Sequence, residues 1–406
     1  MPSHETLPRC PEGARRFGLY LHVPFCLSKC PYCDFVSFSP EVLDETGREA
    51  LIRALEDELT VALRAFPELR GRALDTVYFG GGTPSLLEPG VLAHLLDLAH
   101  GVFRCADLEV TLECNPVTAQ MDRLAAFQAA GVNRISLGVQ SFDPETLRRL
   151  GRRHSAEDSR EACRRVRELG FRSWGLDLIF GTPLPSEDHS VPDSQSVLNG
   201  FERDLETAIT HRPPHLSVYG MTLHEGTPFH DRYGAGQLTL PDEETQRDLF
   251  LLARRRLTAA GWRHYEISNY AWPGHESRHN TLYWSGGEYL GLGVSAHSCF
   301  AGRRRANPAD AAAYLDRVRK GQYPAEAETQ PCERSLRGER IMLALRQVEG
   351  VAVADLDRSL GCDFRKTYSQ ELVRLCGNGL LQLDGERVAL TEEGLLLSDS
   401  VFEEFF

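Results

Sequence analysis

The sequence has no long hydrophobic run. No stretch of its 406 residues approaches 18 consecutive apolar residues, so we expect no membrane-spanning helix. Its first 18 residues also lack the apolar centre of a signal peptide, and their acidic residues Glu5 and Glu12 do not suit an arginine-rich transit peptide. We therefore expect a cytoplasmic protein that is not integral to the membrane, and the sequence leaves a mitochondrial location open.

The sequence also lacks long runs of like charge and a disulfide framework. The net charge is −13 without a long run of either sign, so a phosphate backbone would be repelled on average and we expect no nucleic-acid partner. The eleven cysteines are an odd number scattered over a long chain, which is unlike a disulfide-rich secreted domain. The length itself predicts two to three domains.

What the sequence does contain, between residues 18 and 222, is a repeated unit of a short β-branched or aromatic run, a turn and an amphipathic segment of helical length. Such repetition predicts an α/β fold with a parallel sheet, whose ligands bind at the carboxyl ends of the strands. The predicted strands span 19–24, 76–79, 108–112, 134–139, 175–180 and 216–220. The predicted helices span 43–66, 91–102, 119–130, 156–169 and 201–210.

The remaining segments differ in composition from these repeats. Residues 182–200, rich in Pro, Ser and Asp, predict a surface insertion within a core domain of residues 1–240. Residues 241–330, with a long helix and a region rich in histidine and aromatic residues, are expected to complete that core. Residues 331–406 resemble a winged helix, with three helices and a hairpin. Their nine basic and fourteen acidic residues favour a protein-facing or structural role over DNA binding.

Three clustered cysteines, Cys26, Cys30 and Cys33, lie in the loop after the first predicted strand. Three thiolates at this spacing can converge on one soft metal centre. Zinc would need a fourth ligand from elsewhere in the chain. An iron–sulfur cube held by only three cysteines would instead leave one iron open. The residues alone are compatible with either centre.

The C-x3-C-x2-C pattern resembles the radical S-adenosylmethionine superfamily. This resemblance implies a partial (β/α)6 barrel and a [4Fe–4S] cluster on the three cysteines. It also implies that the open iron binds the amino and carboxylate groups of S-adenosylmethionine, and it leaves open whether the protein cleaves this cofactor. His22, one strand step before the loop, is interpreted either as a residue that tunes the cluster or as a packed strand histidine.

Further motifs at the strand ends complete the predicted cofactor site. The glycines of Phe79-Gly-Gly-Gly-Thr-Pro84 let backbone amides approach a ligand closely, and by the resemblance this segment contacts the methionyl amino group. A carboxylate and an amide suit ribose hydroxyls, and a charged residue inside an apolar strand needs a partner. The predicted S-adenosylmethionine contacts are Tyr20, Tyr32, Gly81, Gly82, Thr83, Glu113, Gln140, Arg152 and Asp177.

The order of the motifs resembles, over nearly the whole chain, the oxygen-independent coproporphyrinogen III oxidase branch of this superfamily. Its oxidative decarboxylases are expected to carry one more cysteine at the position of Phe35. The haem chaperones of the branch lack that cysteine and carry a His-Asn-x-x-Tyr-Trp signature. The signature implies a haem site in which an imidazole ligates the iron and aromatic faces pack on the macrocycle. Here it comprises His279, Asn280, Tyr283 and Trp284.

The leading hypothesis from the sequence is therefore a haem chaperone that delivers haem to membrane-associated haemoproteins, and the sequence leaves a homodimer open. The alternative is an oxygen-independent coproporphyrinogen III oxidase, and a third hypothesis is a radical methyltransferase or a porphyrin-ring-opening relative. His297 is a second candidate for the haem ligand. The signature around His279 is also typical of a buried, hydrogen-bonded histidine among core aromatic residues.

Overall fold

The computed structural model describes residues 16–185, 193–327 and 332–406. Residues 186–192, the centre of the surface insertion predicted over 182–200, lie outside the described residues, as does Cys10. The helix predicted over 201–210 begins earlier, at Ser194. Asp193 caps it by accepting a hydrogen bond from the Ser196 amide, so residues 194–200 are helical.

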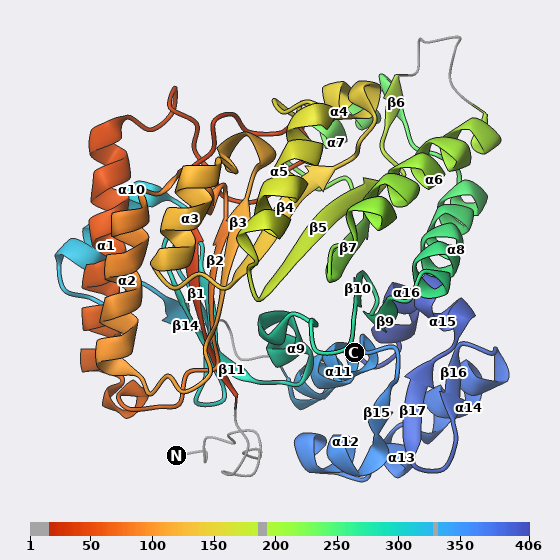
Figure 1. Ribbon diagram of the computed structural model, residues 1–406. Helices are drawn as coiled ribbons and strands as arrows, with labels where there is room; N and C mark the ends of the chain where they lie inside the picture. The colour runs from red at the N-terminus through yellow and green to blue at the C-terminus, as the bar shows by residue number, and fades with distance from the viewer. Residues whose placement is uncertain (1–15, 186–192, 328–331) are drawn as a thin grey trace.

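A twelve-stranded sheet forms the centre of the molecule (Figure 1). The six predicted strands are consecutive neighbours in it and pair in parallel, which confirms the α/β fold class. They are β1 (Phe17–Val23), β2 (Thr76–Gly81), β3 (Glu109–Cys114), β4 (Arg134–Gln140), β5 (Ser173–Phe180) and β7 (His215–Gly220).

Both edges of this parallel core are extended by strands that the sequence did not reveal. Next to β1 the sheet continues with β11 (Glu288–Leu292), which is parallel to β1, and then with the antiparallel strands β12 (His297–Phe300), β13 (Arg303–Ala306) and β14 (Glu326–Ala327). Next to β7 lie the antiparallel strands β10 (Asn269–Ala271) and β9 (Arg263–Glu266). A separate two-stranded sheet pairs β6 (Leu184–Pro185) with β8 (Leu238–Thr239).

The helices that follow the parallel strands pack together on one face of the sheet (Figure 1). Helix α5 has clear sequence signals, since Ser155 and Asp158 form a capping box at its start and Gly170 ends it at a φ of 67°. The helices of this part are α1 (Glu45–Ala65), α2 (Pro89–Val102), α3 (Met121–Ala129), α4 (Pro144–Arg149), α5 (Ala156–Leu169), α6 (Ser194–His211), α7 (Pro228–Gly234), α8 (Glu243–Ala259), α9 (Arg278–Trp284) and α10 (Ala311–Arg319). Short 3-10 turns span Pro67–Leu69, Pro84–Leu86 and Pro116–Thr118.

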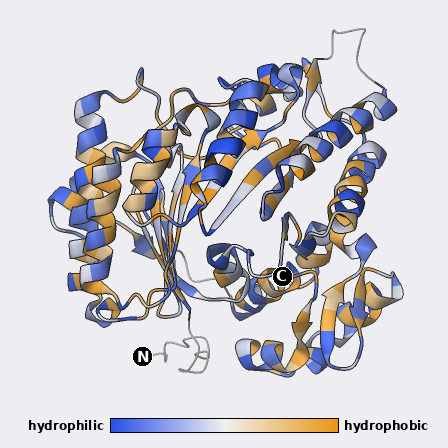
Figure 2. Cartoon of the chain, in the orientation of Figure 1, coloured by the Kyte–Doolittle hydropathy of each residue, from blue (hydrophilic) through white to orange (hydrophobic). Residues whose placement is uncertain are grey.

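Side chains alternate along the parallel strands between an apolar face and a polar face. Leu19 and Phe79 are among the apolar residues that pack against the helices, and hydrophobic residues are concentrated in the strands (Figure 2). The intervening residues carry polar groups that meet one another, as in the hydrogen bonds from Tyr78 to Glu113 and from Ser136 to Asp177. The inside of the partial barrel is therefore polar and suited to a polar ligand.

The C-terminal part has a hydrophobic core of its own, made of residues between Ile341 and Phe405. A three-stranded sheet in the order β15-β17-β16 lies among its helices, in agreement with the winged-helix resemblance. Its elements are α11 (Glu333–Leu345), β15 (Val351–Ala352), α12 (Val353–Leu360), α13 (Phe364–Thr367), α14 (Ser369–Gly377), β16 (Leu381–Leu383), β17 (Arg387–Leu390), α15 (Glu392–Leu396) and α16 (Ser398–Glu403). It lies beside α9 and β9 (Figure 1), and the Val348 amide donates to the Tyr265 carbonyl between the two parts at 3.2 Å.

In the described ranges, no helix combines the length and the apolar character needed to cross a membrane.

Candidate functional site

The three cysteines lie on one loop at the carboxyl end of β1. The Cys26 amide donates to the Phe38 carbonyl at 3.0 Å and the Phe38 amide donates to the Pro24 carbonyl at 2.7 Å, which closes the base of the loop. The Cys33 amide donates to the Cys30 carbonyl at 3.1 Å, so these two cysteines flank a tight turn. All three side chains are half-buried. The loop thus presents three thiols at the mouth of the barrel.

Burial disfavours the charged thiolates of this loop, whereas neighbouring hydrogen-bond donors favour them. Burial raises the pKa of Cys26, and it raises that of Cys33 to about 11, with a further contribution from the neighbouring thiolates. Arg152 Nη1 donates to Cys30 Sγ at 3.6 Å, and Thr83 Oγ1 donates to Cys26 Sγ at 3.8 Å. Such donors stabilise a sulfur that carries negative charge. The donor set therefore fits a soft metal centre.

The cysteines are not arranged around a single metal ion. Within the described ranges, no three or more His, Cys, Asp or Glu side chains are gathered in that way. The Phe35 side chain, at the position where the related decarboxylases are expected to carry a cysteine, is 58% exposed on the same loop.

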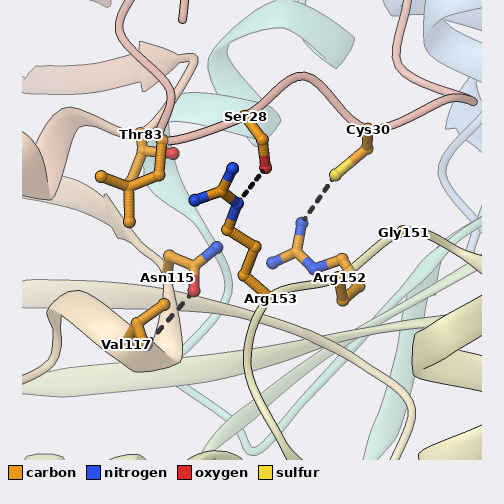
Figure 3. A pocket seen from close by; sticks show the side chains of 9 residues that line it. Ser28, Cys30, Thr83, Asn115, Val117, Gly151, Arg152 and Arg153 are labelled. Carbon is orange, nitrogen blue, oxygen red and sulfur yellow. Dashed lines mark hydrogen bonds between the residues drawn. The ribbon is translucent and has the colours of Figure 1, made fainter. Parts of the chain in front are cut away.

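A small cavity of about 40 Å³ adjoins Cys30. Figure 3 shows the guanidinium groups of Arg152 and Arg153 facing the cysteine loop, where Arg153 Nε donates to Ser28 Oγ at 2.9 Å. Asn115 lies on the opposite wall, and its side chain accepts the Val117 amide at 3.2 Å. Of the residues around this cavity, Cys30, Thr83 and Arg152 were predicted. Ser28, Asn115 and Arg153 had no signal beyond their proximity in sequence to predicted residues. The lining comprises Leu27, Ser28, Cys30, Thr83, Asn115, Val117, Gly151, Arg152 and Arg153.

The glycine segment after β2 packs directly against β1 and the cysteine loop. Gly81 has a φ of 110°, and a Cβ built there would lie 2.6 Å from His22 Cε1. A Cβ on Gly82 would lie 2.6 Å from the Phe25 carbonyl oxygen. Both glycines are therefore required by close packing, because real Cβ atoms do not approach other atoms this closely.

The amides of this segment already donate within the protein, which differs from the predicted approach to a ligand. The acceptors lie on the neighbouring strands and on the cysteine loop, which pack within hydrogen-bond distance of these amides. Gly81 donates to Glu113 Oε2 at 3.1 Å, Gly82 to the Val23 carbonyl at 2.9 Å and Thr83 to the Phe25 carbonyl at 2.6 Å. The segment thus holds the cysteine loop in place.

Two predicted carboxylates lie inside the barrel below this segment. Glu113 accepts a hydrogen bond from the Tyr78 hydroxyl at 2.9 Å, and burial raises its pKa to about 7. Asp177 accepts from Ser136 Oγ at 3.2 Å, and burial raises its pKa as well. The negative charge of Asp177 adds to the shift of Glu113. Both groups can accept hydrogen bonds from amino or hydroxyl groups of a ligand.

Gln140 has a strained backbone at the end of β4. Its φ is 68°, at a point where the register between β4 and β5 shifts by one residue. Left-handed conformations cost energy for a residue with a Cβ and are concentrated at functional positions. Asp204 on α6 holds the turn from behind, because it accepts the Ser141 hydroxyl at 2.5 Å and the Phe142 amide at 2.7 Å. Asp204 was not predicted, since it lies far away in sequence.

The tyrosines predicted to contact the cofactor lie in different surroundings. The Tyr20 hydroxyl is 3.1 Å from His22 Nδ1 inside the barrel, and His22 Nε2 is 2.8 Å from the Val36 carbonyl. His22 therefore ties β1 to the end of the cysteine loop. Tyr32 lies within the loop with its ring centroid 6.2 Å from that of Phe229.

His279 on α9 is fully engaged inside the barrel. Its side chain is 1% exposed, its Nδ1 lies 2.7 Å from Thr76 Oγ1, and its Nε2 lies 2.8 Å from the Tyr283 hydroxyl. Burial, aided by the charge of Arg134, lowers its pKa to about 3, so the imidazole is neutral. Its ring stacks on Tyr78 with centroids 4.9 Å apart. This is the arrangement of a buried, hydrogen-bonded histidine among core aromatic residues, and it offers no free ring nitrogen to a ligand.

The other residues of the signature do not share one surface with His279. The Asn280 amide donates to Ser277 Oγ at 3.3 Å at the start of α9. Trp284 faces the C-terminal part, where the Arg346 guanidinium carbon lies 4.4 Å from its ring centroid. His297, the second ligand candidate, is exposed on β12. The structure therefore brings together His279 and Tyr283 of the predicted haem residues.

Two parts of the chain match family models. Residues 20–189 match the radical SAM superfamily, and residues 336–397 match the HemN C-terminal domain.

Two bacterial relatives are similar to almost the whole chain. The chain is 36% identical to the haem chaperone HemW of Mycobacterium tuberculosis (strain ATCC 25618 / H37Rv) over 392 residues, which cover 96% of this chain and 95% of the relative. It is also 36% identical to HemW of Escherichia coli (strain K12) over 397 residues, covering 96% and 97%. The solved structure of the coproporphyrinogen III oxidase HemN from Escherichia coli shares the fold with a TM-score of 0.78 at 24% identity, covering 96% of this chain and 90% of that one.

Proposed function

Since the chain belongs to the HemW family of the radical S-adenosylmethionine superfamily, we propose that it is a haem chaperone that binds haem, a [4Fe–4S] cluster and S-adenosylmethionine. We propose that it delivers haem to membrane-associated haemoproteins, which would be its partners. The observation that supports this best is that the loop after β1 holds the three cysteines, and that α9, which packs against β1 and β2, holds the complete His-Asn-x-x-Tyr-Trp signature.

The thiolates of Cys26, Cys30 and Cys33 would hold the cluster. When bound, it supplies a low-potential electron for S-adenosylmethionine on its open iron. The residues of this chain provide the surroundings, since Arg152 places a positive charge beside Cys30 at 3.6 Å. The proposed S-adenosylmethionine contacts are Tyr20, Tyr32, Thr83, Glu113, Gln140, Arg152 and Asp177, and Gly81 and Gly82 are proposed as residues that support this site.

Glu113 and Asp177 would accept hydrogen bonds from the hydroxyl and amino groups of this cofactor, whereas the glycines would act by holding the segment that carries Thr83. The amides of the glycine segment would thus contribute to cofactor binding only indirectly, because they donate hydrogen bonds within the protein.

His279 would ligate haem through Nε2. An iron ligand must offer a neutral ring nitrogen, and burial keeps this imidazole neutral. In the tautomer with the proton on Nδ1, Thr76 Oγ1 accepts that proton and the Nε2 lone pair receives the Tyr283 hydroxyl. A second hydrogen bond of this kind commonly orients a ligating histidine. Haem would thus displace the Tyr283 hydroxyl, and α9 must open for it.

A haem titration of the purified protein, followed by the Soret band, tests this site. We expect stoichiometric binding that is lost in His279→Ala and unchanged in His297→Ala, the matched histidine control. In Tyr283→Phe the aromatic face remains but the competing hydroxyl is gone, so the dissociation constant should fall severalfold. Absence of stoichiometric binding in the wild-type protein would remove the haem-chaperone function. Equal binding by His279→Ala would be consistent with a haem chaperone but would show that another residue ligates the haem iron.

Product analysis separates this function from the oxidase that shares the fold. Anaerobic incubation of the cluster-loaded protein with reductant, S-adenosylmethionine and coproporphyrinogen III should give no vinyl product, since Phe35 replaces the additional cysteine expected in the oxidases. Conversion of propionates to vinyl groups would contradict the proposal.

A further inference from the structure

A second and larger cavity lies at the opposite end of the barrel from the cysteine loop. Its volume is about 230 Å³, and Glu109, Arg134 and Ser173, the first residues of β3, β4 and β5, contribute to it. A seven-residue strand such as β4 spans roughly 20 Å at about 3.3 Å per residue, so this cavity is remote from the mouth of the barrel. The full lining comprises Glu109, Asn133, Arg134, Arg172, Ser173, Gly274, His275, Glu276 and Arg278.

Arg134 is the unusual member of this lining. Its side chain is 2% exposed, and it has no hydrogen-bond or ion-pair partner among the residues that the structure describes. The two other arginines of the cavity are engaged, because Arg172 and Arg278 both contact the carboxylate of Asp107, at 2.6 Å and 3.0 Å. A guanidinium group stays charged in proteins, and a buried charge normally requires a partner.

The two acidic residues of the cavity are bonded to other groups. Glu109 accepts the amide of His279 at 3.2 Å, and Glu276 forms an ion pair with Arg263 and accepts the Gly274 amide at 2.9 Å. The charge of Arg134 affects a neighbouring residue. It is the second cause, next to burial, of the lowered pKa of His279. The charge of Arg134 also lowers the pKa of the carboxyl groups of Glu109 and Asp177 against the effect of burial. Among the described residues, however, no carboxylate forms an ion pair or a hydrogen bond with its guanidinium group.

We propose that this cavity binds an oxyanion group, a carboxylate or a phosphate, with the guanidinium of Arg134 as the central donor. The planar fork of a guanidinium matches the two oxygens of either group. Arg172 and Arg278, which are more exposed, lie on the same lining and add positive charge. A volume of about 230 Å³ accommodates a small anion or the acidic end of a larger ligand. The site does not depend on the haem-chaperone proposal, although Arg278 directly precedes His279.

Titration calorimetry on the cluster-loaded, haem-free full chain tests the site, with inorganic phosphate and acetate as separate probes and chloride adjusting the ionic strength. We expect saturable binding of at least one probe with a stoichiometry of one. In Arg134→Gln the dissociation constant should rise at least tenfold. Arg123→Gln is the matched control, because Arg123 donates to the backbone carbonyls of Ser85 and Leu87, between β2 and α2, and lies outside the cavity lining. It should bind like the wild-type protein.

Thermal unfolding in anion-free buffer distinguishes a ligand site from a structural arginine. Because Arg134 has no partner, Arg134→Gln should unfold at the wild-type temperature or above it, and phosphate or acetate should raise the unfolding temperature of the wild-type protein alone. A response to phosphate only would identify a phosphate-bearing ligand, and a response to acetate only a carboxylate. The proposal is overturned if neither probe binds saturably, if Arg134→Gln binds equally well, or if that variant unfolds at a lower temperature or does not fold.

Discussion

The two ends of the parallel strands hold their functional side chains in opposite ways. At the carboxyl end, Cys26, Cys30 and Cys33 are half-buried on a loop that adjoins a small cavity. Toward the amino end, His279 is buried with both ring nitrogens in hydrogen bonds to Thr76 and Tyr283. The three thiols therefore lie at the mouth of the barrel beside a cavity, whereas both ring nitrogens of His279 are occupied by hydrogen bonds in the interior.

This difference follows from the elements that carry the residues. A loop after a parallel strand lies at the edge of the sheet, where ligands bind in such folds. Helix α9 instead packs against β1 and β2, so its motif becomes part of the interior. Tyr20 lies between the two ends, with its hydroxyl 3.1 Å from His22 Nδ1 and its ring centroid 6.4 Å from that of His279.

The largest expected effect concerns the cysteine loop. Cys30→Ser should abolish cluster binding, because the loop then offers only two thiolates. Cys376→Ser on α14, far from the loop in the C-terminal part, should leave it intact. Iron and sulfide analysis after anaerobic reconstitution, together with the visible spectrum, measures both variants. A full cluster in Cys30→Ser would show that its ligands lie elsewhere.

The support of that loop can be weakened without touching a cysteine. Gly82→Ala places a Cβ 2.6 Å from the Phe25 carbonyl oxygen, so we expect the free energy of unfolding to fall by up to about 3 kcal/mol, with reduced cluster content. Gly101→Ala in α2 has nothing within 4 Å of its new Cβ and should be neutral or slightly stabilising. Denaturant unfolding compares the two. Equal stability of both variants would mean that the backbone yields at Gly82 without cost.

Glu113 should make the carboxyl end sensitive to pH. Its pKa rises from an ordinary value of 4.5 to about 7 in the folded protein, so the folded state binds the proton more tightly than the unfolded state. Its contribution to stability is present below pH 4.5 and is lost as the pH rises to 7, by about 3 kcal/mol. Glu113→Gln should remove this decline. Unfolding of the cofactor-free protein across this range tests it, and parallel curves for both proteins would contradict it.

The smallest expected effect concerns the closed site. Thr76→Val keeps the shape of the side chain but removes the partner of His279 Nδ1, at a cost of about 1 kcal/mol in stability. If His279 ligates haem through Nε2, the same change should weaken haem binding about tenfold, because the ring loses the hydrogen bond that orients it. Tyr283→Phe is expected to act in the opposite direction. Haem titrations of both variants would show whether the two nitrogens have these separate roles.

Much of the fold could be predicted from the sequence. The six parallel strands and the helices between them follow from local alternation, as for β4, which was expected at 134–139 and spans Arg134–Gln140. The sheet extension from β11 to β14 could not be predicted, because its short strands have no regular repeat and pair only after the chain has returned to β1. Asp204 was missed for a related reason, since it meets Ser141 across 63 residues of sequence.

The sequence by itself determined the chemistry that is available, because the spacing of the three cysteines and the order of the strand-end motifs are local properties of the chain. Only the tertiary structure decided which groups are reachable. Packing of α9 against the sheet buried His279, the glycine amides found acceptors on neighbouring strands, and Arg134 was enclosed without a partner. Burial and hydrogen-bond pairing depend on contacts between distant segments, which no local pattern contains.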